Sequence, residues 1–341
     1  MHKIYLLALL TFVFSCTTKE VKKDVFVPVT VDTKPTIDTD TIPVKAVAEY
    51  GQLSIVNNKI VDKNGKPVQL RGMSLFWSQW IGKYYNADVV NWLKKDWQCN
   101  VIRAAMAIES GGYLENKAVE KAKIYTVIDA AIKEGIYVIV DWHDHNGEKH
   151  LEAAKAFFSE VAQKYKDVPN IIYEPYNEPL NVSWTSVLKP YHEAVIAEIR
   201  KHDPDNLIIC GTRNWSQNVN DVINNKIADP NVAYTLHYYS ATHKQNLRDI
   251  AKAAINAGVP LFVTEYGVSE ASGDGSIDTE EAAKWWAFLD ENGISHCNWS
   301  IADKSELSAA LKPNANQNGS WALSDLSTSG LMVRKEIRAK N

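Results

Sequence analysis

The sequence predicts an α/β fold, a (β/α)8 or TIM barrel preceded by a short β-hairpin. Apolar runs typical of strands recur along the chain, and helical patterns lie between most of them. These runs are Val68–Met73, Val101–Ala105, Ile136–Asp141, Ile171–Tyr176, Leu207–Cys210, Val232–His237, Leu261–Glu265 and Ser295–Trp299. Such alternation is typical of a parallel barrel. A doubly wound sheet would need a glycine-rich phosphate turn after its first strand, which Arg71-Gly72-Met73-Ser74 does not provide.

The first segment, residues 1–16, resembles a bacterial lipoprotein signal peptide. A short basic start precedes the apolar run Ile4–Phe14, which is too short to cross a bilayer as a permanent helix. The small residue Ser15 precedes Cys16, and the resemblance implies that Cys16 is lipidated and becomes the mature N-terminus. The alternative is an ordinary secretory signal that happens to contain a cysteine. The lipoprotein interpretation predicts a membrane-anchored protein in the periplasm or on the cell surface.

Two features precede the first barrel strand. Residues 17–48 are rich in Lys, Asp, Thr, Val and Pro and have no helical period, which indicates a flexible tether. Alternating apolar residues in Leu53–Val56 and Lys59–Asp62, separated by Asn57-Asn58, predict a β-hairpin that could close the bottom of the barrel. The barrel domain would then cover residues 49–341.

Three of the expected helices have clear sequence signals. Lys117–Lys133 and Leu188–Ile199 repeat apolar residues at helical spacing. A third helix is expected to start at Asp278, where acidic residues fill the first turn, and to end before Gly293.

The composition is that of a globular, water-soluble protein. The formal net charge is -4, which favours neither nucleic acid nor an acidic lipid surface as a partner. Apart from Cys16, the chain has Cys99, Cys210 and Cys297, which cannot form a complete set of disulfides. The last two lie in strand-like runs, so we expect small buried side chains. We expect a monomer that meets the membrane only through its N-terminal lipid.

Two carboxylate motifs carry the functional prediction. Tyr176-Asn177-Glu178-Pro179 and Thr264-Glu265-Tyr266-Gly267 each follow an apolar β-type run. Active sites of such barrels lie at the C-terminal ends of the strands, so both glutamates should face one cleft. Two carboxylates about 5 to 5.5 Å apart can cleave a sugar linkage with retention. The pairing predicts a glycoside hydrolase, with Glu178 as general acid and base and Glu265 as nucleophile.

Other polar residues end the remaining strands and would surround the two glutamates. They are Arg103, His143, Asn177, His237 and Tyr239. Arg103 and Tyr239 are suited to donate hydrogen bonds to Glu265 and so to keep it ionised. Nearby negative charge and partial burial are expected to raise the pKa of Glu178, which must hold a proton near neutral pH.

Three tryptophans are expected to bind sugar rings by stacking. The chain has 11 tryptophans, and we expect most of them to be core residues. Trp299 ends the eighth predicted strand, where its ring would form the floor of a sugar site. Trp80 and Trp215 lie in loops after the first and fifth strands and could extend this platform.

A metal-dependent hydrolase is the alternative that His143 and His145 suggest. Histidines at alternate positions of a strand point the same way and can bind one ion. Such a site would want further histidines and an aspartate at later strand ends. His237 is available, but the last two strands end in Glu265 and Trp299. We therefore expect no metal and no cofactor, and expect His143 to bind sugar hydroxyls.

Together these motifs closely resemble glycoside hydrolase family 5, and within it the bacterial endo-β-1,4-glucanases (cellulases), over residues 53–338. The matching stretches are Leu70–Ser74, Arg103–Met106, Val140–His143, Asn177–Pro179, Gly211-Thr212, Trp215–Gln217, His237–Tyr239, Thr264–Gly267, Asn298–Ser300, Lys304–Glu306, Ser308–Leu311, Leu323-Ser324 and Ser329-Gly330. The resemblance implies a TIM barrel and a retaining double displacement without metal on internal β-1,4-glucosidic bonds of cellulose or related β-glucans. It also implies substrate contacts by Lys304 and Glu306.

Departures from the family pattern leave the substrate open. Phe76 stands where close relatives often carry histidine, and Ala107 where they often carry tyrosine. The loop Asp144–Lys149 looks shorter than usual. The same machinery could act on mannan, xyloglucan or mixed-linkage β-glucan. A non-catalytic glucan-binding lipoprotein is the other alternative, although such a protein would be expected to have lost Glu178 or Glu265.

Overall fold

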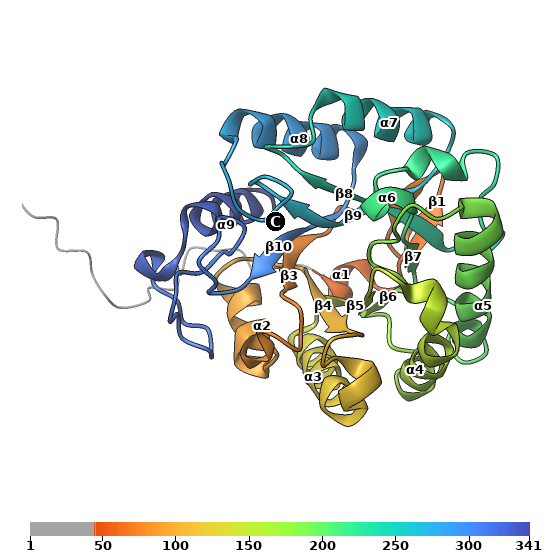
Figure 1. The fold of residues 1–341 in the computed structure, drawn as a ribbon, viewed down its shortest axis with the longest axis horizontal. Coiled ribbons are helices and arrows are strands. Elements are labelled where there is room, and N and C mark those ends of the chain that lie inside the picture. The colour runs from red at the N-terminus through yellow and green to blue at the C-terminus, as the bar shows by residue number, and fades with distance from the viewer. Residues whose placement is uncertain (1–43, 45) are drawn as a thin grey trace, which may run out of the picture. The chain divides into compact units, whose positions relative to one another are not determined.

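Helices surround a parallel β-barrel in the computed structural model, which describes residues 44 and 46–341 (Figure 1). The predicted signal peptide with Cys16, and residues 17–43 and 45 of the predicted tether, lie outside the described residues. The described residues belong to one compact unit.

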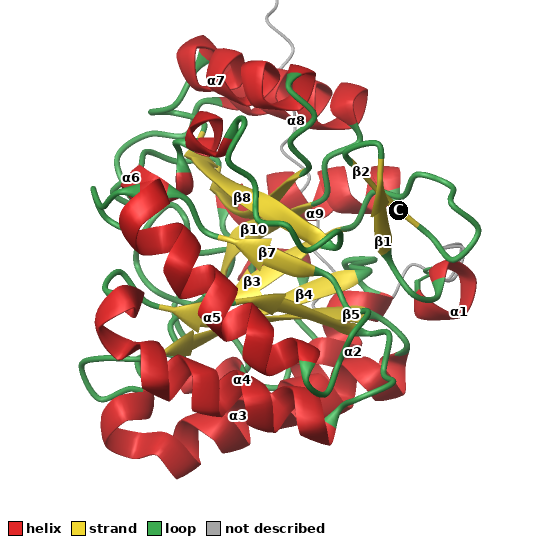
Figure 2. Ribbon diagram, turned by 90° about the vertical axis from the view of Figure 1, so that its right-hand side faces the viewer, coloured by secondary structure: helices red, strands yellow, loops and turns green. Residues whose placement is uncertain are grey.

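The barrel closes through parallel strands in chain order, which confirms the predicted fold (Figure 2). Its strands are β3 (Arg71–Leu75), β4 (Val101–Ala107), β5 (Tyr137–His143), β6 (Ile171–Glu174), β7 (Ile208–Cys210), β8 (Val232–Tyr239), β9 (Leu261–Gly267) and β10 (His296–Ile301). The last strand, β10, pairs with both β9 and β3 and closes the ring. Gly72 allows the close approach of β3 to β4, because a Cβ there would lie 1.7 Å from the Val101 carbonyl oxygen.

Several strands extend past their predicted ends. β5 ends at His143, β8 at Tyr239, β9 at Gly267 and β10 at Ile301, each two residues later than expected. The polar residues at these positions therefore lie within the backbone ladder and do not end it. At the other end, β3 starts only at Arg71.

Helices pack around the barrel in both views, most of them along its outside. They are α1 (Val47–Tyr50), α2 (Ala87–Lys95), α3 (Tyr113–Glu134), α4 (Leu151–Lys164), α5 (Lys189–Arg200), α6 (Arg213–Ser216), α7 (Gln245–Asn256), α8 (Thr279–Asn292) and α9 (Thr328–Lys340). The predicted start of α8 is confirmed, since Asp278 accepts a hydrogen bond from the Glu281 backbone N–H. Gly293 ends the helix in the left-handed conformation, as the sequence indicated.

The predicted hairpin forms from β1 (Ser54–Val56) and β2 (Lys59–Val61). The segment before it lies at the N-terminal ends of the barrel strands. The Tyr137 hydroxyl donates to the Gly51 carbonyl (2.7 Å), and the Asn231 side chain donates to the Leu53 carbonyl (3.2 Å). Helix α1 crosses the expected boundary at Ala48, and the Val47 backbone N–H donates to the Gly135 carbonyl (3.0 Å).

The remaining cysteines, Cys99, Cys210 and Cys297, are buried and unpaired, and burial was expected for the last two. Across residues 44 and 46–341, no helix combines the length and the hydropathy that a membrane span requires.

Candidate active site

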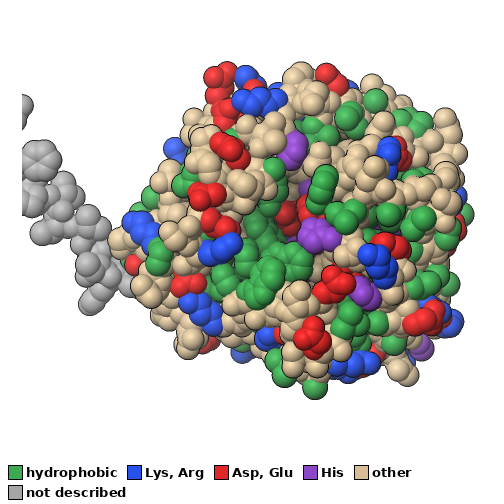
Figure 3. All heavy atoms as spheres, in the orientation of Figure 1, with side chains coloured by type: hydrophobic (Ala, Val, Ile, Leu, Met, Phe, Trp, Pro, Cys, Tyr) green, Lys and Arg blue, Asp and Glu red, His purple; other side chains and the backbone are tan. Residues whose placement is uncertain are grey.

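A cleft of about 640 Å³ opens at the C-terminal ends of the barrel strands and contains both predicted catalytic glutamates. Its lining residues are Glu178, Asn214, Trp215, Gln217, His237, Tyr239, His243, Glu265 and Ala271. Figure 3 shows acidic side chains and histidines beside an apolar hollow on this face. Apolar walls beside a few converging polar groups are typical of a ligand site.

Glu178 and Glu265 face one another across the cleft. Glu178 follows β6 and Glu265 lies within β9. One carboxylate oxygen of each lies within 4.8 Å of the other and of a His237 ring nitrogen. Retaining glycosidases hold their carboxyl groups about 5 to 5.5 Å apart, whereas inverting enzymes hold them about 6.5 to 9.5 Å apart. The short separation favours retention.

Two donors hold the Glu265 carboxylate in place. Arg103 Nη1 lies 2.9 Å from Oε2, and the Tyr239 hydroxyl donates to Oε1 at 2.7 Å. Both are the donors that the sequence suggested. Hydrogen bonds to both oxygens fix the orientation of this carboxylate.

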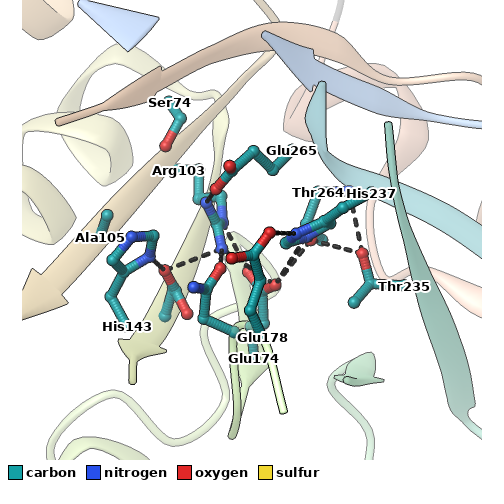
Figure 4. A network of polar contacts seen from close by, with 12 residues as sticks. Ser74, Arg103, Ala105, His143, Glu174, Glu178, Thr235, His237, Thr264 and Glu265 are labelled. Carbon is teal, nitrogen blue, oxygen red and sulfur yellow. Dashed lines mark hydrogen bonds and ion pairs between the residues drawn. The ribbon is translucent and has the colours of Figure 1, made fainter. Parts of the chain in front are cut away.

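Arg103 is completely buried and binds two further carboxylates that the sequence analysis missed as site residues (Figure 4). Its Nε donates to Glu174 Oε2 (2.7 Å), and Nη2 lies 2.9 Å from Asp141 Oδ2. Burial raises the pKa of Asp141 to about 8 and that of Glu174 to about 7, and Arg103 opposes both shifts. The cluster gives one buried cation several carboxyl partners, which fixes the position of the guanidinium.

Asn177 lies between Arg103 and the cleft. Its Oδ1 accepts a hydrogen bond from Arg103 Nη2 (2.6 Å). This bond orients the amide, and its buried Nδ2 has no protein partner. A buried donor without a partner is costly, so this amide is ready to donate to a bound ligand.

Glu178 is mostly buried and lies between two histidines. His237 Nδ1 is 2.9 Å from its Oε1, and His145 Nδ1 is 3.6 Å from its Oε2. Burial raises the pKa of Glu178 to about 7, while His145 and Arg103 lower it. The expected direction is correct, and burial, rather than the expected negative charge, is the main cause of the rise.

His143 and His145 do not face a common ion. His143 Nδ1 lies 2.6 Å from Asp141 Oδ2, whereas His145 turns to Glu178. This contact occupies Nδ1 and leaves His143 Nε2 for a ligand. The ring stacks on Trp299, with centroids 5.0 Å apart and planes 3° apart. Trp77, which the sequence analysis did not select, packs edge-on against the same ring at 4.1 Å.

The outer predicted contacts lie on two sides of the glutamates. Trp215 lines the cleft and is 48% exposed. Trp80, which is 60% exposed, packs with Trp77 and Phe76 on the side of Trp299. Lys304 Nζ lies 5.3 Å from the centre of the Phe76 ring and 2.6 Å from Glu306. All these side chains therefore belong to the same mouth of the barrel.

One feature of the sequence could have identified the two carboxylates that bind Arg103. Asp141 and Glu174 are charged residues at the ends of otherwise apolar strand runs, and a buried charge needs a partner. His145 was considered only as a metal ligand, although it contacts Glu178. His243 and Gln217 line the cleft from loops, where no strand period marks them.

Comparison with known families gives one match over most of the chain. A family model described as cellulase (glycosyl hydrolase family 5) matches residues 61–305. Endoglucanase A of Evansella cellulosilytica is 48% identical over 80% of this chain and 57% of its own length. Endoglucanase N of Pectobacterium atrosepticum is 46% identical over 86% of this chain and 67% of its own length. The chain therefore spans little more than half of the first of these relatives.

Solved structures match more completely. One from Cytophaga hutchinsonii is 54% identical, covers 87% of this chain and 97% of its own, and has a TM-score of 0.86. The catalytic domain of Thermobifida fusca endoglucanase Cel5A, in complex with cellotetraose, is 34% identical with a TM-score of 0.83 and covers 86% of this chain and 99% of its own.

Proposed function

Since this chain belongs to the cellulase family, glycosyl hydrolase family 5, we propose that it is an endo-acting, retaining hydrolase of internal β-1,4-glucosidic bonds in cellulose or related β-glucans. The observation that carries the proposal is the pair Glu178 and Glu265, with carboxylate oxygens within 4.8 Å. Relatives named endoglucanases and a similar structure that holds cellotetraose support the substrate class.

The reaction has two steps. In the first, a Glu265 oxygen attacks the anomeric carbon while Glu178 gives its proton to the departing glycosidic oxygen. A glycosyl ester on Glu265 forms as the glycosidic bond breaks. In the second step, Glu178 takes a proton from water, whose oxygen attacks the anomeric carbon and releases the Glu265 carboxylate. The sugar keeps its configuration, and both glutamates return to their starting states.

The surrounding residues would bind the sugar chain. Asn177 Nδ2 and His143 Nε2 are available to sugar hydroxyls next to the reacting bond. The Trp299 ring would carry a sugar face, with Trp80 and Trp215 further out. His237 and Tyr239 hold the two glutamates, and the paired Lys304 and Glu306 offer polar contacts beside Phe76. No step of this mechanism calls for a metal or cofactor.

The sequence also supports a location for the enzyme. Residues 1–16 would direct secretion, and lipidation of Cys16 would anchor a monomeric barrel to a membrane in the periplasm or at the cell surface. Residues 17–43 would separate the lipid from the barrel and let the cleft reach a polymer.

The test is a reducing-end assay on carboxymethylcellulose, mannan, xyloglucan and mixed-linkage β-glucan, with viscosity followed in parallel. We expect the highest kcat/KM on a β-1,4-glucan and an early loss of viscosity, because internal cleavage shortens chains quickly. NMR should first detect the β-anomer of the new reducing end. A preference for mannan would overturn the substrate class, and the α-anomer would overturn retention. Binding without turnover would favour the non-catalytic alternative.

A further inference from the structure

A chain of hydrogen bonds links Glu178 to the buried Glu174 (Figure 4). Glu178 Oε1 is 2.9 Å from His237 Nδ1, and His237 Nε2 is 2.9 Å from Thr264 Oγ1. The Thr264 hydroxyl in turn donates to Glu174 Oε1 at 2.6 Å. Glu174, Thr264 and His237 are all buried, so water does not compete for these bonds.

The donors along this chain can be assigned one by one. Thr264 has one hydroxyl proton, and it points to Glu174. Its oxygen must then accept from His237 Nε2, which therefore carries a proton. Thr235 lies within hydrogen-bond distance of the same oxygen and accepts from the Thr264 backbone N–H, so both threonines are satisfied.

Burial decides how many protons His237 holds. Its pKa is lowered to about 4 by burial, so the ring is neutral at working pH and carries a single proton. With that proton on Nε2, Nδ1 is an acceptor. Nδ1 can then accept a hydrogen bond from Glu178 only when the Glu178 carboxyl is protonated.

We propose that Glu174 is a positioning residue that fixes the His237 tautomer through Thr264 and thereby keeps a proton on Glu178. In the opposite arrangement Glu174 carries the proton and Glu178 is ionised. The same atoms then form the same hydrogen bonds with donor and acceptor exchanged in each. Arg103 selects between the two, because it donates to Oε2 of Glu174 at 2.7 Å and to Oε1 at 3.2 Å. Burial raises the pKa of both carboxyls to about 7, and these two hydrogen bonds favour the ionised form of Glu174 over that of Glu178.

Other charged groups also act on Glu178. Besides His237 on β8, it faces His145 after β5, Arg103 on β4 and Glu265 on β9. Glu178 has no arginine hydrogen-bonded to its oxygens, in contrast to Glu174. The proposal rests on Glu178 being the acid of the proposed function, but the tautomer of His237 can be measured without any substrate.

Glu174→Gln should exchange donor and acceptor in each hydrogen bond between residue 174 and Glu178. The new amide oxygen would face Arg103 Nε, the closest donor, which places the NH2 group against Thr264. Thr264 would then donate to His237 Nε2, and His237 would carry its proton on Nδ1. That proton would stabilise ionised Glu178. Thr264→Val removes the hydroxyl that links His237 to Glu174 and should leave the tautomer unselected.

The direct test is the two-bond 15N–1H imidazole NMR spectrum, with the His237 signal identified by its absence in His237→Gln. Below the alkaline limb of the activity profile, we expect the Nε2–H form in the natural protein and the Nδ1–H form in Glu174→Gln. Thr264→Val should show a mixture. An Nδ1–H form in the natural protein, or the same tautomer in all three proteins, would overturn the proposal.

The second test is the pH dependence of kcat/KM. In Glu174→Gln we expect the alkaline limb of the profile to shift to lower pH by about one unit. Glu120→Gln is the matched control, because Glu120 is also buried but bonds Ser78 and Lys123 outside the site. A limb that moves equally in both variants, or in neither, would contradict the proposal. If the natural protein had no glycosidase activity, the proposed function would be refuted, but the NMR result on the His237 tautomer would still hold.

Discussion

Glu178 and Glu265 are the same chemical group in two environments, and these environments separate their proposed roles. Glu265 receives hydrogen bonds from Arg103 and Tyr239, at 2.9 and 2.7 Å. Glu178 receives no comparable donor and is mostly buried, which raises its pKa to about 7. One carboxyl is therefore prepared to attack and the other to give a proton, without any difference in residue type.

The first prediction concerns pH. Glu178 must be protonated to act as the acid, and this form is lost as pH rises through its raised pKa. We therefore expect kcat/KM on a cello-oligosaccharide to fall as pH rises through about 7. On an aryl glycoside with a good leaving group the alkaline fall should be much weaker, because no acid is needed. An alkaline limb of equal size on both substrates would exclude Glu178 as its source.

The second prediction separates acid from nucleophile. Glu178→Gln should lower activity on polysaccharide by about 100- to 10,000-fold and spare an activated aryl glycoside. Glu265→Gln should remove activity on both substrates, because no glycosyl ester can form. Steady-state rates of both variants on the two substrates would distinguish the acid from the nucleophile. If the two variants behave alike, or the pattern is exchanged between them, the assigned roles are wrong even within the same family.

At the scale of elements, the pairing of β8 with β9 explains the glycine in Thr264-Glu265-Tyr266-Gly267. Tyr239 and Gly267 are partners in the ladder. A Cβ on Gly267 would lie 2.2 Å from Tyr239 Cδ1. The glycine thus leaves room for the ring whose hydroxyl holds Glu265, so a backbone requirement of β9 serves the site.

The third prediction tests this packing. Gly267→Ala should push the Tyr239 ring away and weaken its bond to Glu265, a charged hydrogen bond that contributes about 2 kcal/mol, or roughly 30-fold in kcat/KM. Tyr239→Phe removes the same bond without a clash and is the matched comparison. Both variants should lose activity on natural and on activated substrates. Full activity in Gly267→Ala would show that β8 and β9 can adjust, and would remove this role for the glycine.

At the scale of the whole molecule, the closed barrel brings residues that lie far apart in the chain to one mouth. Residues on the strands from β4 to β10, or in the loops that follow these strands, form the site. The segment before the barrel contacts the N-terminal ends of the strands, away from this mouth. We therefore expect that catalysis and the proposed attachment to a membrane can be separated by mutation.

The fourth prediction concerns that separation. Cys16→Ser should release the protein from membranes or block its processing, because the proposed lipid would be attached through the thiol. A protein that lacks residues 1–43 should keep the kcat/KM and melting temperature of the mature full-length enzyme. Membrane fractionation and thermal unfolding would measure both effects. Unchanged membrane retention in Cys16→Ser would rule out the lipoprotein anchor, and a large loss of kcat/KM on truncation would show that the tether contributes to catalysis.

Local patterns in the chain were sufficient to predict the barrel and the two glutamates. Strand and helix periods are short-range properties, and their alternation indicates a fold in which all strand ends meet at one rim. Glu178 and Glu265 could be placed at that rim because each lies at or near the end of an apolar run, whereas Arg103 lies within the run that forms β4. The same logic predicted the hairpin and the caps of α8.

The partners of these residues required the folded chain. Glu174 bonds Arg103 across 71 positions and Thr264 across 90 positions, and no periodic pattern links them. Strand tilt and register set which side chains meet inside the barrel, and burial sets how strongly they hold protons. The strand ends, the cause of the raised Glu178 pKa and the chain through His237 all follow from that three-dimensional packing.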